Sequence, residues 1–288
     1  MPKLLVNGVN LSYQQFGCGS DLVMIHGLAA NRAFWYLPIA QHLEQKFRIT
    51  LYDLRGHGYS DTPPSGYTAA DMTRDLKGLL DRLEIRQATL VGHSFGGLIA
   101  LHYALKYPQQ ISSLVLADSR IYALQPLQRL QDVSYRSPLE EQLLSQSDRD
   151  WEREPHIGLR FLEAIAKEQW GTRTETDEGE FIPFKGIYGG SRMAKKWVNL
   201  LNQTTARQDF ERDRELTVEQ IRQLSQPLLA IYGERSRCLD SCNALKKLLP
   251  ACQTQIVPGV GHFHPVTQPQ NFLNALTDFL KTTNCYAS

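Results

Sequence analysis

Residues 88–97 read ATLVGHSFGG, and the fold of the chain can be inferred outward from them. The apolar run Ala88–Val91 has the character of a strand, and a helix is expected over about 95–106. Between the two lies Gly92–Gly96, which fits the pattern Gly-x-Ser-x-Gly. A residue on so sharp a turn needs neighbours almost without side chains, since strand and helix approach each other closely there. The stretch therefore predicts that Ser94 is a nucleophile raised above the end of a sheet.

The same alternation of short apolar runs and longer helical stretches continues on both sides of this turn. Strands that are apolar throughout are buried on both faces, which is typical of a parallel sheet covered by helices. We therefore predict an α/β fold with a mostly parallel central sheet flanked by helices. The further strands are expected at Leu4–Val6, Val9–Tyr13, Leu22–Ile25, Arg48–Tyr52, Ile111–Ala117, Pro227–Tyr232 and Thr254–Val257, and the further helices at about 32–44, 69–83, 241–249 and 268–280.

The alternation stops after Ala117 and resumes at Pro227, and between them the sequence is charged, helix-prone and without clear strands. The simplest account is one α/β core domain, residues 1–118 and 226–288, interrupted by a mostly helical insertion, residues 119–225. Aromatic residues of the insertion could line an apolar binding site or form the insertion's own core: Trp151, Phe161, Trp170, Phe181, Phe184, Tyr188 and Trp197.

Composition narrows the possible partners. Apolar residues make up 42% of the chain and charged residues 21%, which is the balance of a folded globular protein. The formal charge is +1, so there is no electrostatic case for nucleic acid or an anionic membrane as a partner. No run reaches the ~18 apolar residues of a membrane helix, and the N-terminus does not read as a signal peptide. We expect a small-molecule substrate and no integral membrane segment, and the oligomeric state does not follow from the sequence.

The cysteines are odd in number and contain no Cys-x-x-Cys pair: Cys18, Cys238, Cys242, Cys252 and Cys285. Cys238 and Cys242 are one helical turn apart, but two thiols without a nearby histidine pair make a poor metal site. Free thiols in a reducing cytoplasm are the simplest interpretation. We therefore predict a cytoplasmic location and neither a metal nor an organic cofactor.

A serine hydroxyl becomes a good nucleophile only when a neighbouring base removes its proton. His262 follows Gly261 just after the run Thr254–Val257, in a loop at the carboxyl end of the predicted sheet, where Ser94 also emerges. His264 is the alternative, but it lies further from the strand and has no glycine beside it. We predict that His262 is the general base.

Attack on a carbonyl also needs N–H donors for the negative charge that develops on its oxygen. Such donors commonly come from the residue after the nucleophile and from the loop after an early strand. The first is the backbone N–H of Phe95, and the second is expected from the loop His26-Gly27-Leu28, with Leu28 as the donor. His26 itself is expected to buttress this loop without taking part in catalysis.

The sequence resembles the α/β-hydrolase family at four places, and the resemblance extends over nearly the whole chain outside the insertion: His26-Gly27, Asp53–Ser60 (DLRGHGYS), Gly92–Gly97 and Gly261-His262. This resemblance implies that the insertion is a cap over Ser94. It also implies that Asp53 and Arg55 order the loop after the fourth strand and do not act in catalysis.

The chain departs from the family pattern at the acid that should orient the histidine. Most relatives carry this acid three residues beyond a glycine that ends the seventh strand, and here Ser236 stands three residues after Gly233. A hydroxyl cannot carry the negative charge that stabilises an imidazolium. Some esterases of the family place the acid after the sixth strand instead. Similarity to them points to Asp118, with Ser236 as a hydrogen-bond partner of Asp118 or His262.

Two other carboxylates remain candidates for the acid. Asp240 follows Gly233 by seven residues, but it is better explained as the N-cap of the following helix. Glu234 comes directly after Gly233, where its side chain is expected to point away from the base.

The resemblance implies a serine hydrolase that cleaves a carboxylic ester or thioester by acyl transfer, and the expected substrate has an apolar acyl or alcohol group. Two other classes stay open: a carbon–carbon hydrolase or lyase on the same scaffold, and a ligand-binding protein without catalysis. Dehalogenase and epoxide-hydrolase activities are disfavoured, because both need a carboxylate where Ser94 stands.

Overall fold

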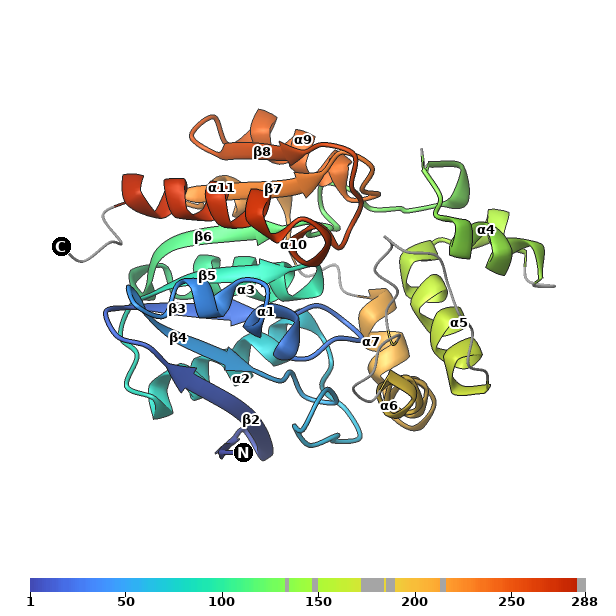
Figure 1. Ribbon diagram of the computed structural model, residues 1–288, viewed down its shortest axis with the longest axis horizontal. Helices are drawn as coiled ribbons and strands as arrows, with labels where there is room; N and C mark the ends of the chain where they lie inside the picture. Colours follow the sequence, from blue (N-terminus) through green and yellow to red (C-terminus); the bar gives the residue numbers. More distant parts are fainter. Residues whose placement is uncertain (133–134, 147–149, 172–183, 185–189, 213–215, 284–288) are drawn as a thin grey trace.

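The structure of the protein is a computed structural model that describes residues 1–288 apart from 133–134, 147–149, 172–183, 185–189, 213–215 and 284–288. In the part of the chain that it describes, an eight-stranded sheet forms the centre of the molecule (Figure 1). Its strands lie in the order β1-β2-β4-β3-β5-β6-β7-β8. They are β1 Lys3–Val6, β2 Val9–Phe16, β3 Ser20–Ile25, β4 Phe47–Tyr52, β5 Ala88–His93, β6 Ile111–Ala117, β7 Leu228–Gly233 and β8 Gln253–Val257.

The sheet is mostly parallel, as the sequence predicted. Strand β2 pairs antiparallel with β1 and β4, and every other neighbouring pair is parallel. In the parallel part, Ile25 of β3 lies opposite Gly92 of β5, and His93 of β5 lies opposite Ala117 of β6. The residues that follow these three strands therefore meet at one edge of the sheet.

Helices cover both faces of the sheet. They begin and end as follows in the described residues: α1 Ala33–Tyr36, α2 Ala69–Arg82, α3 Phe95–Lys106, α4 Pro138–Ser145, α5 Ile157–Gly171, α6 Gly190–Gln203, α7 Ala206–Arg212, α8 Val218–Arg222, α9 Leu239–Leu248, α10 His264–Thr267 and α11 Pro269–Thr282. None of them is long and apolar enough to cross a bilayer.

Strand β3 is apolar over Leu22–Ile25 because successive side chains enter two different cores. In β3, Val23 and Ile25 pack with α2, α3 and α9 on one face of the sheet. Leu22 and Met24 pack with α1 and α11 on the other face. All four side chains are completely buried. The two-layer burial of β3 thus explains why the sequence shows no alternation of apolar and polar residues there.

The predicted helix over 32–44 is wrong. Helix α1 ends at Tyr36, and only a short 3₁₀ turn, Ala40–His42, follows it. Pro38 lies between the two, and a proline has no backbone N–H to continue a helical hydrogen-bond ladder. The other predicted helices of the core agree with α2, α3, α9 and α11 to within about two residues at either end.

Between β6 and β7 the chain forms a helical insertion, as predicted. Helices α4 to α7 lie beside the edge of the sheet at which β3, β5 and β6 end (Figure 1). The described part of the insertion contains no strand. Gln128 and His156 form an isolated β-bridge there. This position places the insertion over the edge from which Ser94 emerges.

Several aromatic residues of the insertion pack on one another. Trp151 stacks on Phe161, and Trp197 stacks on Phe210 of α7. These four side chains and that of Phe184 are buried. They build the insertion's own core, while Phe161 and Phe210 also border the cavity described below. The side chain of Trp170, and Phe181 and Tyr188, lie outside the described residues.

Candidate active site

Ser94 sits on the turn between β5 and α3 in a backbone conformation that is unusual for an L-amino acid, with φ at 54° and ψ at −121°. The glycines around it leave no room for a side chain. A Cβ at Gly92 would lie 2.4 Å from the carbonyl oxygen of Gly96, and a Cβ at Gly96 would lie 2.4 Å from that of Ile25. The Gly-x-Ser-x-Gly pattern is therefore required by the close contact of α3 with β5 and β3.

Asp118 directly follows β6, and its carboxylate is completely buried. Oδ2 accepts a hydrogen bond from the backbone N–H of Gly233 at 2.8 Å. Oδ1 accepts a hydrogen bond from the Ser236 hydroxyl and lies 2.9 Å from Nδ1 of His262. The carboxylate is thus held by β7 and the loop that follows it, and it faces the loop that carries His262.

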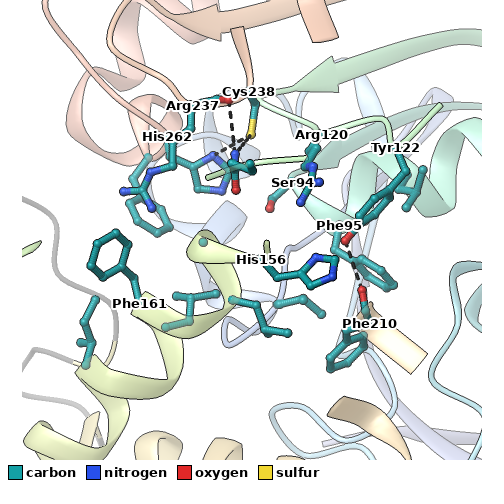
Figure 2. A pocket seen from close by; sticks show the side chains of 18 of the residues that line it. Ser94, Phe95, Arg120, Tyr122, His156, Phe161, Phe210, Arg237, Cys238 and His262 are labelled. Atoms are coloured by element: carbon teal, nitrogen blue, oxygen red, sulfur yellow. Dashed lines mark hydrogen bonds between the residues drawn. The ribbon is translucent and has the colours of Figure 1, made fainter. Parts of the chain in front are cut away.

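His262 lies in the loop after β8, with Nδ1 directed at Asp118 and its side chain 28% exposed. Since Nδ1 is engaged there, Nε2 is the ring nitrogen that remains for proton transfer. Nε2 of His93 donates a hydrogen bond to the carbonyl oxygen of His262 at 2.9 Å, which ties the loop to the residue before Ser94. Ser94 and His262 border one cavity (Figure 2).

Two opposing effects act on the pKa of His262. Burial lowers it, but the hydrogen bond to Asp118 and the contact with the Cys238 thiol outweigh burial and raise the pKa above its ordinary value of 6.5. A carboxylate that raises the pKa of an imidazole stabilises the imidazolium, which is the ion formed when a base takes a proton from serine.

The other candidates for base and acid do not border the cavity. His264 is completely buried; its Nε2 donates to the carbonyl oxygen of Ile231 at 3.1 Å and lies 3.6 Å from Oδ2 of Asp118. Glu234 accepts a hydrogen bond from the N–H of Gly259 at 2.8 Å, on the exposed side of the loop. Asp240 is exposed and lies inside the first turn of α9.

The prediction that Asp240 caps α9 is wrong. The helix begins at Leu239, and Cys238 occupies the N-cap position. The Ser236 hydroxyl accepts a hydrogen bond from the N–H of Cys238 at 3.0 Å, so it also satisfies a backbone donor at the start of this helix. Ser236 therefore links the entry to α9 to the Asp118 carboxylate.

The two predicted oxyanion donors border the cavity beside Ser94. The N–H groups of Phe95 and Leu28 have no hydrogen-bond partner among the described residues. The loop that carries Leu28 passes directly by the nucleophile, because a Cβ at Gly27 would lie 2.9 Å from Cβ of Ser94. Two free donors next to a serine are suited to binding the oxygen of a carbonyl under attack.

Buried side chains hold this loop in place. Nδ1 of His26 donates to the carbonyl oxygen of Gly27 at 2.7 Å, and Nε2 accepts from the N–H of Leu54 at 3.1 Å. Burial lowers the pKa of His26 to about 4, so the ring is neutral and can play both roles. Nε2 of His57 likewise accepts from the N–H of Ala29 at 3.2 Å. His57 was not singled out from the sequence, where only its place in the Asp53–Ser60 stretch could have signalled it.

Asp53 and Arg55 make structural contacts. Asp53 accepts hydrogen bonds from the N–H groups of Arg32 and Tyr59, both at 2.9 Å. Arg55 forms a two-pronged ion pair with Asp75 of α2, at 2.6 Å for each bond. Neither residue borders the cavity.

Cys238 is a site residue whose position the sequence did not reveal. Its Sγ lies 3.9 Å from Nδ1 of His262, and it borders the cavity. In the described part of the chain, one group of three side chains has ligand atoms close enough to hold a metal ion. It consists of Asp118, Cys238 and His262, whose ligand atoms lie within 4.8 Å of one another. Nδ1 of His262 faces Asp118, however, so a metal ion would have to displace the proton that they share.

The cavity lies between the core and the insertion, and its lining contains two sets of side chains, which we call the apolar wall and the polar wall. One is apolar and is formed by Leu98, Leu159, Phe161, Leu162, Ile165, Phe210 and Phe263. The other is polar and is formed by Arg120, Tyr122, Gln128, Glu140, His156 and Arg237. Figure 2 shows that side chains of both kinds converge on the space next to Ser94.

The fold and this arrangement define a class of protein. The family model for the alpha/beta hydrolase fold matches residues 22–269. The chain belongs to the α/β-hydrolase family.

Full-length relatives with different activities resemble the chain at similar levels. A 2-(acetamidomethylene)succinate hydrolase from Mesorhizobium japonicum is 28% identical, over 96% of this chain and 93% of the relative. A pimeloyl-[acyl-carrier protein] methyl ester esterase from Vibrio vulnificus is 27% identical, over 94% and 98%. A 2-hydroxymuconate semialdehyde hydrolase from a Pseudomonas species is 26% identical, over 99% and 95%.

Proposed function

We propose that this chain is a serine hydrolase that cleaves a carboxylic ester, with Ser94 as nucleophile, His262 as general base and Asp118 as the acid that orients His262. The observation that carries the proposal is the 2.9 Å contact between Asp118 and His262 at a cavity that also contains the strained Ser94. A serine, an imidazole and a buried carboxylate in one chain of contacts are the parts that acyl transfer requires.

The reaction would proceed in two steps. His262 takes the proton of Ser94 as the hydroxyl oxygen attacks the ester carbonyl, and the N–H groups of Leu28 and Phe95 stabilise the oxyanion. The leaving alcohol takes the proton from His262, which leaves an acyl-enzyme. Water then attacks the acyl-enzyme by the same route and releases the acid. A thioester would follow the same path with a thiol as leaving group.

The relatives support hydrolysis as the reaction class, but they do not identify the type of bond that is cleaved. The Vibrio vulnificus protein is named as a methyl ester esterase, which favours ester cleavage. The apolar wall of the cavity supports an apolar segment in the acyl or alcohol group, as the sequence predicted. We also propose residues 119–225 as the cap that closes this cavity over a core of residues 1–118 and 226–288.

The proposal is tested by turnover of p-nitrophenyl esters by the wild type and by Ser94→Ala. We expect release of p-nitrophenol by the wild type and its loss in Ser94→Ala. Ser225→Ala is a matched control, because Ser225 is exposed and does not border the cavity, and it should retain wild-type turnover. A folded wild type without turnover of any ester would contradict the esterase proposal.

A second candidate is the hydrolysis of a carbon–carbon bond. The 2-hydroxymuconate semialdehyde hydrolase, similar over nearly the full length of both chains, favours it. In that reaction Ser94, Asp118 and His262 would act as a proton relay, and product analysis would find a broken carbon–carbon bond. Turnover of 2-hydroxymuconate semialdehyde at a rate well above that of simple esters would favour this candidate over the esterase.

A further inference from the structure

A thiol, an imidazole and a carboxylate meet on the side of His262 that faces away from Ser94. Nδ1 of His262 lies 2.9 Å from Oδ1 of Asp118 and 3.9 Å from Sγ of Cys238. The ligand atoms of all three side chains lie within 4.8 Å of one another. A tetrahedral Zn²⁺ ion with bonds of about 2.0–2.3 Å holds its ligand atoms roughly 3.3–3.8 Å apart. Shifts of about 1 Å or less would therefore bring these three atoms around one ion.

The kinds of ligand atom determine which cation would fit. Thiolate, imidazole and carboxylate are all ligands of Zn²⁺, whereas Mg²⁺ and Ca²⁺ prefer oxygen ligands. Along the sequence, Cys238 has only Cys242 as a metal-binding neighbour within one helical turn. The fold brings it a histidine from the loop after β8 and a carboxylate from the end of β6 instead. This set of ligand atoms favours a thiophilic divalent cation.

Hydrogen bonds around the group hold two of the ligands in place. The Asp118 carboxylate is completely buried, and its Oδ2 accepts a hydrogen bond from the N–H of Gly233 at 2.8 Å. The Ser236 hydroxyl donates to Oδ1 of Asp118 and accepts from the N–H of Cys238 at 3.0 Å. Ser236 therefore links the residue with the carboxylate to the residue with the thiol. Outer contacts of this kind orient the ligands of metal sites.

Access and charge also suit a cation. Cys238 and His262 both border the cavity, so an ion can reach them from it, and a water molecule can take the fourth tetrahedral position (Figure 2). The carboxylate and a thiolate together carry two negative charges, which balance the charge of a divalent ion. Arg237, the residue before Cys238, is paired with Glu140, and this pairing offsets its repulsion of a cation.

We propose that Asp118, Cys238 and His262 bind a thiophilic divalent cation such as Zn²⁺, and that the bound ion inhibits the proposed hydrolase. A neutral imidazole carries one proton, on either of its two nitrogens. When the ion binds Nδ1, that proton moves through water to Nε2, and the proton of the thiol is released to water. Nε2 then has no free lone pair to accept the proton of Ser94. The inhibition rests on the proposed function, whereas the metal site does not.

Titration with Co²⁺, a coloured substitute for Zn²⁺, tests the site without measuring turnover. We expect the near-ultraviolet absorption of a cobalt–thiolate bond in the wild type, and its loss when Zn²⁺ is added. Cys238→Ala should lack this absorption, and so should Cys238→Ser, which nearly keeps the size of the side chain. Cys18→Ala is the matched control, because Cys18 is an exposed thiol between β2 and β3, and it should keep the absorption. Circular dichroism shows whether each variant is folded.

Turnover of a p-nitrophenyl ester at increasing Zn²⁺ concentration tests the inhibition. Each protein is compared with its own rate without metal, because Cys238 contacts the base. We expect Zn²⁺ to inhibit the wild type, EDTA to restore turnover, and Mg²⁺ to have no effect at about a hundredfold higher concentration. Cys238→Ala should need about tenfold more Zn²⁺ or beyond, since even an outer partner of a metal ligand is worth that much. Cys18→Ala should respond as the wild type does.

The outcomes separate this inference from the esterase proposal. A wild type without the cobalt–thiolate absorption, or absorption that persists in Cys238→Ala or is lost in Cys18→Ala, would overturn the metal site. Equal inhibition of the wild type and Cys238→Ala would place the inhibiting ion elsewhere and overturn the inference, with the esterase intact. Absorption without inhibition would overturn the inhibitory role. Absence of ester turnover in metal-free wild type would contradict the esterase proposal, and the cobalt spectra would still decide the metal site.

Discussion

At the scale of single residues, Asp118 is the proposed acid, because the pattern after β7 supplies none. Its carboxylate contacts both Ser236, which stands at that position, and His262. The hydroxyl of Ser236 donates to the carboxylate and so stabilises its ionised form. The serine thus stabilises the carboxylate of the proposed acid, which follows the neighbouring strand β6.

The change Asp118→Asn tests this assignment. We expect turnover to fall by about 10⁴-fold, the size of the effect when a triad aspartate becomes an amide, because the amide cannot stabilise the imidazolium. Asp240→Asn is the control, since Asp240 is exposed, and it should stay within about twofold of the wild type. Steady-state kinetics on one p-nitrophenyl ester measures both. A loss of less than about tenfold in Asp118→Asn would remove Asp118 from the mechanism.

The titration of His262 gives a pH prediction. A base must be neutral to accept a proton, so kcat/KM falls as the pH drops through the pKa of His262. Because that pKa is raised above 6.5, the loss of activity should begin at a pH above 6.5. In Asp118→Asn the raising contact is gone while burial still lowers the pKa, so the titration moves to lower pH.

NMR titration of the His262 ring in Ser94→Ala, with and without Asp118→Asn, measures this shift directly. Ser94→Ala removes the reaction and keeps the histidine in place. Equal pKa values in the two proteins would mean that the contact with Asp118 does not govern the proton on His262.

At the scale of elements, the turn between β5 and α3 depends on a backbone approach that only glycine permits. A Cβ at Gly96 would lie 2.4 Å from the carbonyl oxygen of Ile25 and 2.5 Å from that of His26. Backbone atoms at the end of β3 cannot move aside as a flexible side chain can. The turn therefore joins β3, β5 and α3 into one unit.

Gly96→Ala should lower the free energy of unfolding by about 3 kcal/mol or more, because the methyl group would overlap the backbone of β3. Gly259→Ala is the matched control. Gly259 has a positive φ of 70° but nothing within 4 Å of its Cβ position, so only backbone strain of about 1 kcal/mol is expected. Urea unfolding measures both. Equal losses in the two variants would contradict the close packing at the turn.

The sequence was a reliable guide to the presence of the core strands and helices and a poorer one to where some helices begin and end. Strands such as β5 are apolar because both faces are buried, and that signal is in the residues themselves. The helix expected over 32–44 ends at Tyr36, because Pro38 cannot continue the helical hydrogen bonds. The start of α9 was misplaced because Cys238, a residue with no strong capping preference, precedes Leu239.

At the scale of the whole molecule, the cavity lies where the insertion meets the carboxyl edge of the sheet, and both parts contribute to its apolar wall. Leu98 comes from α3 of the core, while Leu162 and Phe210 come from α5 and α7 of the insertion. A chain of methylene groups would therefore be buried on both sides. Each buried methylene contributes about 0.8 kcal/mol to binding.

A comparison of p-nitrophenyl acetate with p-nitrophenyl octanoate tests this wall. We expect a higher kcat/KM for octanoate, because its chain reaches the side chains of α5 and α7. Leu162→Ala should reduce the advantage by removing part of that contact, without affecting acetate. Faster turnover of acetate than of octanoate at equal concentration would count against a roomy apolar site.

The site could be predicted from the sequence only in part. Ser94 and His262 stand in local patterns, beside glycines at the ends of strands. Asp118 required the resemblance to particular esterases, since a carboxylate after a strand has no pattern of its own. The place of Cys238 in the site could not be found, because its contact with His262 forms only when the loops after β7 and β8 come together.

The central claim is that Ser94 is a nucleophile activated by His262, and covalent labelling by a fluorophosphonate tests it most directly. Mass spectrometry of the digested adduct should place the phosphonyl group on Ser94 in the wild type. Labelling should be lost in Ser94→Ala and slowed strongly in His262→Ala. A label on another residue, or a rate unchanged in His262→Ala, would contradict the claim.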